Sequence, residues 1–159
     1  MLKWLALSLV VIAADQATKY IVMHELALHE RVTVTSFFNL VYVYNRGAAF
    51  SFLAGASGWQ REFFIGIAFA ASAWVIYLLR KHTREALFSF SLSLILGGAL
   101  GNVIDRLLYG AVVDFLDFHA YGYHWPAFNV ADSAITCGAV LLVWDSIRPR
   151  KPEAAVASR

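Results

Sequence analysis

The feature that most constrains this fold is a set of four long apolar segments, at residues 4–23, 63–79, 86–104 and 127–144. A helix needs about 20 mainly apolar residues to cross the hydrocarbon core of a bilayer. The chain is 60% hydrophobic, well above the roughly 45–50% apolar content of soluble domains. The sequence therefore predicts a membrane protein built as an all-α bundle of four transmembrane helices.

The first apolar segment also has features of a secretory signal peptide, because Lys3 precedes a short apolar run that ends in small residues at Ala14. Two observations argue against cleavage there. Ile12 fits poorly at the third position before such a cut, and the apolar pattern resumes over residues 17–23. We therefore interpret residues 4–23 as the first spanning helix.

Basic residues predict the orientation of the bundle. With four spans, Lys3 and the basic clusters at 80–84 and 148–151 all fall on one side of the membrane. The positive-inside rule makes this side cytoplasmic. We expect a multi-pass membrane protein with both termini in the cytoplasm, one integral-membrane domain over residues 1–148 and a disordered tail over 149–159. The basic residues form no patch suited to nucleic acid.

Residues 30–56 differ from the spans, because they contain no apolar run of 18 residues. They show alternation at 32–35, a β-rich stretch at 37–44 and a turn signal from Asn45 to Gly47. An open sheet edge cannot lie in hydrocarbon, where its backbone groups would be unpaired. The pattern predicts a small β-element outside the membrane, with Asn45 at the aqueous boundary and a second outer segment, a loop, at 105–127.

Carboxylates occur at the outer end of three different spans. Asp15, Asp105 and Asp132 lie at this level, and Asp114 follows in the outer segment. A charged side chain at the centre of a spanning helix costs roughly 2.5–3.5 kcal/mol on insertion scales, so such residues are rare without a use. Lys19 is four residues after Asp15 and shares its helix face, which allows the two to pair. The sequence predicts one carboxylate site at the outer leaflet.

Two close carboxylates can hydrolyse a peptide without a metal or cofactor. They share one proton, so the ionised group takes a proton from water and the other donates to the substrate carbonyl. Asp132 is the first candidate, because it lies deepest at the start of its helix. If residues 112–118 are extended, Asp114 and Asp117 point to opposite faces, and only one of them can face Asp132. The residues alone leave that choice open.

The remaining polar residues near the acids have two interpretations each. Asp105 adjoins Arg106, which favours a fixed, ionised structural role for this carboxylate. Asn102 and Asn129 flank the acids and could orient them or hold the peptide. Both asparagines could instead cap helices.

Three other kinds of protein fit the sequence less well, namely a zinc protease, a rhomboid protease and a transporter. His24 and His29 belong to a segment one residue too long for the HExxH zinc motif, and five helical residues separate two side chains by about 140°. Ser57 resembles the serine segment of rhomboid proteases but falls in a predicted turn at 55–58. A small proton-coupled transporter using Asp15 would need a carboxylate near the bilayer midplane and little mass outside.

Five segments together resemble the bacterial lipoprotein signal peptidase (signal peptidase II) family. They occur in the family's order and are DQATK at 15–19, YNRGAAFSF at 44–52, GGALGNVIDR at 97–106, VVDF at 112–115 and FNVADS at 128–133. The resemblance implies four transmembrane helices with a periplasmic β-cradle and a short interfacial helix. It further implies an aspartic endopeptidase that cuts diacylglyceryl-modified prolipoproteins just before the lipidated cysteine, at the outer face of the inner membrane. Membrane lipid and globomycin-type inhibitors are the other implied partners.

The resemblance also implies the residue roles. Its catalytic aspartates fall on Asp114 and Asp132, which settles Asp114 over Asp117. The positions that it implies for substrate binding or support of the site are Asp15, Lys19, Asn45, Gly47, Asn102, Asp105, Arg106 and Asn129. It implies no metal.

Overall fold

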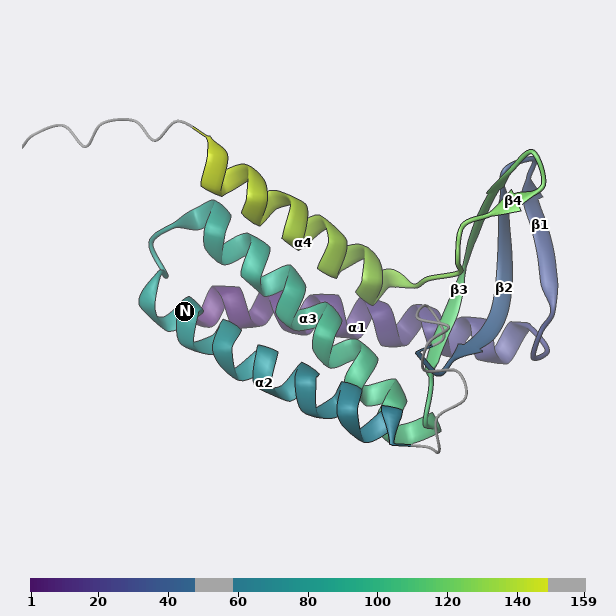
Figure 1. The fold of residues 1–159 in the computed structure, drawn as a ribbon, viewed down its shortest axis with the longest axis horizontal. Helices are drawn as coiled ribbons and strands as arrows, with labels where there is room; N and C mark the ends of the chain where they lie inside the picture. The colour runs from purple at the N-terminus through teal and green to yellow at the C-terminus, as the bar shows by residue number, and fades with distance from the viewer. Residues whose placement is uncertain (48–58, 149–159) are drawn as a thin grey trace, which may run out of the picture.

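A computed structural model describes residues 1–47 and 59–148. Its helices are α1 (Leu2–Glu25), α2 (Gln60–Lys81), α3 (Ala86–Tyr109) and α4 (Val130–Ile147), arranged as a bundle (Figure 1). Each is long and apolar enough to cross a membrane. Large apolar side chains such as Ile67, Trp74 and Val140 are exposed on the outside of the bundle, as lipid-facing positions require. The predicted four-span membrane fold is confirmed.

Helix α3 lies at the centre of the bundle and packs against the other three. Glycines permit this close approach. A Cβ atom on Gly97 would lie 2.6 Å from the Cβ of Val11 in α1, and one on Gly98 would overlap the backbone oxygen of Ala131 in α4. A Cβ on Gly101 would lie 2.7 Å from the Asp15 carboxylate. Gly97 and Gly101, four residues apart on one face of α3, therefore form part of the contact surface between α3 and its neighbours.

Four strands form one antiparallel sheet in the order β1 (Arg31–Thr35), β2 (Phe38–Asn45), β3 (Val112–Ala120) and β4 (Tyr123–His124). The strands run across one end of the bundle (Figure 1). A small apolar core, which includes Val22 of α1, Tyr42 of β2 and Val113 of β3, joins the sheet to the bundle. The predicted β-element outside the spans is confirmed over β1 and β2.

The second outer segment differs from the predicted loop at 105–127. Its first residues continue α3 to Tyr109, and Gly110, with φ of +74°, ends that helix in the left-handed conformation. Residues 112–120 then form β3, which pairs with β2 so that Val43 lies opposite Asp114. The segment is thus part of the same sheet as β1 and β2. The fourth helix begins at Val130 rather than at 127, because Asn129 caps it.

The described elements include no counterpart of two predicted features, the short interfacial helix and the tail. The short interfacial helix does not occur within residues 1–47 or 59–148 and stays an expectation. The tail at 149–159 lies outside the described residues, as do Ser57 and the end of the predicted β-region.

Candidate active site

Asp114 lies in β3 with its side chain almost fully buried. Both of its carboxylate oxygens accept hydrogen bonds from amide side chains. Asn129 Nδ2 donates to Oδ1 at 2.7 Å, and Asn45 Nδ2 donates to Oδ2 at 2.9 Å. Two donors on two different oxygens fix the plane of the carboxyl group. Its orientation is therefore set by β2 on one side and by the start of α4 on the other.

The pKa of the Asp114 carboxyl is raised from its ordinary value to about 7. Burial is the largest cause, because it disfavours the charged form, and the negative charge of Asp132 acts in the same direction. The hydrogen bonds from Asn45 and Asn129 and the charge of Lys19 oppose the shift. Asp114 thus holds a proton at a pH where an exposed aspartate has lost it.

Asp132 lies in the first turn of α4, where the helix dipole favours a negative charge. Asn102 Nδ2 of α3 donates to its Oδ1 at 2.7 Å, and its backbone N–H donates to Asn129 Oδ1 at 2.9 Å. The Asn129 side chain therefore contacts Asp114 through its nitrogen and the backbone of Asp132 through its oxygen. One amide group fixes the relative position of the two aspartates.

Asn129 and Asn102 differ in whether they cap a helix. Asn129 both caps α4 and orients an acid, because its oxygen and nitrogen face opposite partners. Asn102 caps no helix, since it lies within α3. Its Oδ1 accepts hydrogen bonds from Lys19 Nζ at 3.1 Å and from Asn129 Nδ2 at 3.2 Å, and its Nδ2 donates to Asp132. Asn102 therefore connects the lysine to the aspartate pair.

Lys19 is the buried cation of the site, with an exposed fraction of 1%. Its Nζ lies 2.8 Å from the Asp15 carboxylate and 2.7 Å from the Asp105 carboxylate. Asp15 also accepts from the backbone N–H of Ala131 in α4 at 2.9 Å. Asp105 accepts from the backbone N–H of Val113 in β3 at 3.0 Å. These charges tie α1, α3, α4 and β3 together at one level.

Asp105 forms its ion pair with Lys19 of α1 and not with the adjacent Arg106. Neighbouring helical residues point in directions about 100° apart. Asp105 consequently faces α1, while Arg106 lies over the ring of Phe64 in α2, at 5.2 Å from its centroid. Arg106 Nη1 also donates to the Asn102 backbone oxygen at 3.2 Å. Arg106 thus borders the site on the α2 side.

Two further residues shape the edge of the site. Gly47 has φ of +96°, and its N–H donates to Asn45 Oδ1 at 2.8 Å, so the turn holds the amide that faces Asp114. Gln16 also lies at the site, although the sequence analysis did not predict it there. Its Nε2 donates to Asp105 Oδ1 at 2.9 Å and to the Gly101 backbone oxygen at 3.2 Å. Its position between Asp15 and Lys19 was the only signal in the sequence.

Asp117 belongs to a separate cluster on the opposite face of β3. It accepts from Asn39 Nδ2 at 2.8 Å, and His124 Nδ1 lies 2.8 Å from its other oxygen. Burial tends to raise its pKa, but the two hydrogen bonds together with the charges of His124 and Arg31 lower the pKa below the ordinary value. The expected opposite orientation of Asp114 and Asp117 is confirmed.

The geometry supports acid–base chemistry between two carboxylates. Within the described residues, no group of three or more His, Cys, Asp and Glu side chains is placed to hold a metal ion. Asp114 and Asp132 lie at the ends of the spans next to the sheet, away from the ends of α2 and α4 where Lys81 and Arg148 lie. They come from a strand and a helix whose relative position is fixed by hydrogen bonds of the Asn129 side chain. Such a pair can activate water and protonate a carbonyl oxygen.

Comparisons with known proteins agree on one family. The family model described as signal peptidase (SPase) II matches residues 7–148. A lipoprotein signal peptidase of Ralstonia nicotianae is 60% identical over 145 residues, which cover 91% of this chain and 84% of the relative. One of Burkholderia vietnamiensis is 61% identical over 145 residues, with coverages of 91% and 87%. A solved bacterial membrane enzyme, determined by the in meso method, superimposes with a TM-score of 0.83 at 32% identity, covering 94% of this chain and 96% of that one.

Proposed function

Because the chain belongs to the signal peptidase II family and removes signal peptides from prolipoproteins, we propose that Asp114 and Asp132 catalyse this hydrolysis as an aspartic pair. The observation that carries the proposal is the double contact of Asn129. Its side chain donates to the Asp114 carboxylate and accepts from the Asp132 backbone. This contact holds one carboxyl group that is protonated near neutral pH beside a second one in the first turn of a helix.

The proposed reaction proceeds in two steps. Asp132, as the carboxylate, takes a proton from a water molecule, whose oxygen attacks the peptide carbonyl carbon. Asp114 gives its proton to the carbonyl oxygen, and a neutral tetrahedral diol forms. In the second step Asp132 gives its proton to the amide nitrogen, a hydroxyl of the diol returns a proton to Asp114, and the C–N bond breaks to release a carboxylic acid and an amine. No covalent intermediate and no cofactor is required.

The other polar residues hold this pair in place. Asn45 and Asn129 orient Asp114, and Asn102 orients Asp132. Lys19 supplies the positive charge that pairs with the buried carboxylates of Asp15 and Asp105. In this proposal Asp15, Asp105, Gly47 and Arg106 support the site through their contacts with those residues.

We further propose that the substrate is a diacylglyceryl-modified prolipoprotein, cut just before its lipidated cysteine. A cut beside a lipid-bearing residue requires water and acyl chains to meet, and the aspartates lie where the spans end and the sheet begins. Each buried methylene of the lipid contributes about 0.8 kcal/mol to binding. Globomycin-type inhibitors would occupy the same site.

The proposed location is the bacterial inner membrane, with both termini in the cytoplasm and the aspartates facing the periplasm. Arg80 and Lys81 end α2, and Arg148 follows α4, at the ends of the bundle away from the sheet. The alternative of a proton-coupled transporter using Asp15 is not supported. Asp15 is fully buried and is bound to Lys19 and to the backbone of Ala131.

Substitution of the two aspartates tests the aspartic mechanism. Asp114→Asn and Asp132→Asn should each reduce cleavage of a diacylglyceryl-modified prolipoprotein at least about 100-fold, the lower range for a lost acid or base. The assay is the gel shift of the processed substrate, with immunoblotting to show that each variant accumulates in the membrane. Asp117→Asn, on the other face of the same strand, is the matched control and should retain substantial activity. Near-normal cleavage by either of the first two variants would disprove the pair.

A further inference from the structure

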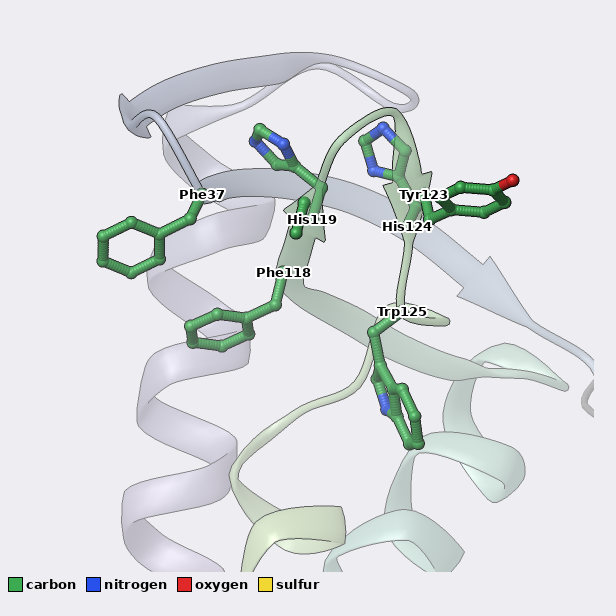
Figure 2. A pocket seen from close by; sticks show the side chains of 7 residues that line it. Phe37, Phe118, His119, Tyr123, His124 and Trp125 are labelled. Atoms are coloured by element: carbon green, nitrogen blue, oxygen red, sulfur yellow. The ribbon is translucent and has the colours of Figure 1, made fainter.

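The outer tip of the sheet carries exposed aromatic side chains that the proposed hydrolysis does not use. Phe37 is 56% exposed, Phe118 40% and Trp125 70%. These three rings help to line an open hollow of about 370 Å³ (Figure 2). Large apolar side chains gathered on an exposed surface indicate an interaction site.

A row of rings connects this tip to the outer end of α4. Phe128 precedes α4 by two residues and stacks on Phe118 at a centroid distance of 5.9 Å, and Phe118 contacts Phe38 at 4.8 Å. Trp125 lies five residues before Val130, and its backbone N–H donates to the Phe118 oxygen at 2.8 Å. Five residues span at most about 17 Å. Trp125, at the aromatic tip, therefore lies no farther than this from the start of α4.

Phe118 lies on the side of the sheet on which α4 begins, since its ring stacks on Phe128, two residues before that helix. Figure 2 shows Phe118 and Trp125 pointing to that side, while His119 and His124 lie near the hairpin turn on the other. Alternation along β3 requires Phe118 and His119 to point in opposite directions. In Figure 1 the β4 end of the sheet reaches past the outer end of α4, on the side away from α2. With the four helices spanning the bilayer, that side of the sheet beyond α4 is turned toward the membrane.

We propose that Phe37, Phe118 and Trp125 form an anchor that inserts into the interfacial layer of the outer leaflet. Aromatic side chains, Trp above all, concentrate at this layer of the bilayer. Among the described residues, the lining of the hollow includes no Asp, Glu, Lys or Arg, and its two histidines lie near the hairpin turn. The anchor holds β3 down on the membrane and thereby keeps Asp114 at the level of Asp132. This inference depends on the membrane fold and not on the aspartic mechanism.

Spin-label accessibility tests the anchor directly. Cys137 is the single cysteine of the chain, so Cys137→Ser provides a background into which Phe118→Cys or Trp125→Cys is introduced. Each labelled protein is placed in nanodiscs of phosphatidylethanolamine and phosphatidylglycerol. Both labels should collide more often with oxygen than with a water-soluble nickel chelate. Two positions are used so that a folding defect in one variant leaves the other to decide.

Thr33→Cys provides the matched control. Thr33 is exposed and pairs with Asn39, which in turn pairs with Asp117, so it lies on the face opposite Phe118. Its label should favour the nickel chelate. Labels at 118 and 125 that match the control in nickel accessibility would overturn the anchor. Nickel accessibility that falls only after a prolipoprotein is added would also overturn it, because the surface would then dock peptide instead of lipid.

Discussion

The most informative perturbation is Asn45→Ala, because it changes the proton affinity of Asp114 without removing a carboxyl group. The pair works with one proton, so kcat/KM should fall as the pH rises through the pKa of Asp114, about 7. The Asn45 amide donates to the carboxylate and favours its ionised form. Removing this donor should raise the pKa, and the alkaline limb of the profile should move to higher pH.

The size of the movement follows from the hydrogen bond that is lost. A hydrogen bond to a charged group contributes about 1.5–3 kcal/mol, and one pKa unit corresponds to about 1.4 kcal/mol. Asn45 is only half-buried, so water replaces part of its donation. We expect a shift of roughly half to one pKa unit on this basis. The measurement is kcat/KM against pH for a detergent-solubilised lipid-modified substrate, since this ratio reports the free enzyme.

The chain offers a matched control for this change in Asn39, which lies in the same strand. Asn39 Nδ2 donates at 2.8 Å to Asp117, as Asn45 does at 2.9 Å to Asp114. Asn39→Ala therefore removes an equivalent bond from a carboxylate outside the proposed pair and should leave the limb in place. An unmoved or acid-shifted limb in Asn45→Ala, or equal shifts in both variants, would refute the assignment of the limb to Asp114.

Two further predictions concern stability. Lys19→Met should lower the free energy of unfolding by about 3–5 kcal/mol, because it leaves two buried carboxylates without their cation. Thermal unfolding in detergent measures the loss. Lys81→Met, at the exposed end of α2, is the control and should be nearly neutral. Gly98→Ala should cost about 1–3 kcal/mol, because its Cβ would overlap the backbone of Ala131. Gly66→Ala, where nothing lies within 4 Å of the added carbon, is its control in the same unfolding measurement, and equal melting temperatures for the two glycine variants would contradict the packing argument.

Local patterns predicted the helices and the pairing of Asp15 with Lys19, because both depend on residues close in sequence. The spans followed from length and apolarity, and a separation of four residues places two side chains on one helix face. The start of α4 was placed at 127, and the cap at Asn129 puts it at Val130. Phe128 belongs to the apolar run but pairs with Leu116 of β3. The run alone does not show that the helix begins after this residue.

Contacts between distant segments were beyond the reach of local patterns. The alternation in 112–118 was visible, but its pairing with β2 joins residues about 70 positions apart and leaves no mark in either strand alone. The same holds for Asp105, whose cation comes from α1. The residues alone also left the choice between Asp114 and Asp117 open, and only the family resemblance favoured Asp114. Both lie in one strand among apolar residues, and only the partners on each face distinguish them.

The arrangement around Asn129 links the folding of the bundle to the assembly of the site. Its side chain satisfies an N–H at the start of α4, which a helix needs in any case, and the same amide fixes Asp114. Lys19 and Asp105 act similarly, because the carboxylate that neutralises the lysine also accepts from the backbone of β3. Neither β3 nor the start of α4 can shift without breaking a buried hydrogen bond to a charged group. The proposed catalytic geometry is therefore maintained by the same bonds that hold the sheet on the bundle, and a change that loosens one should loosen the other.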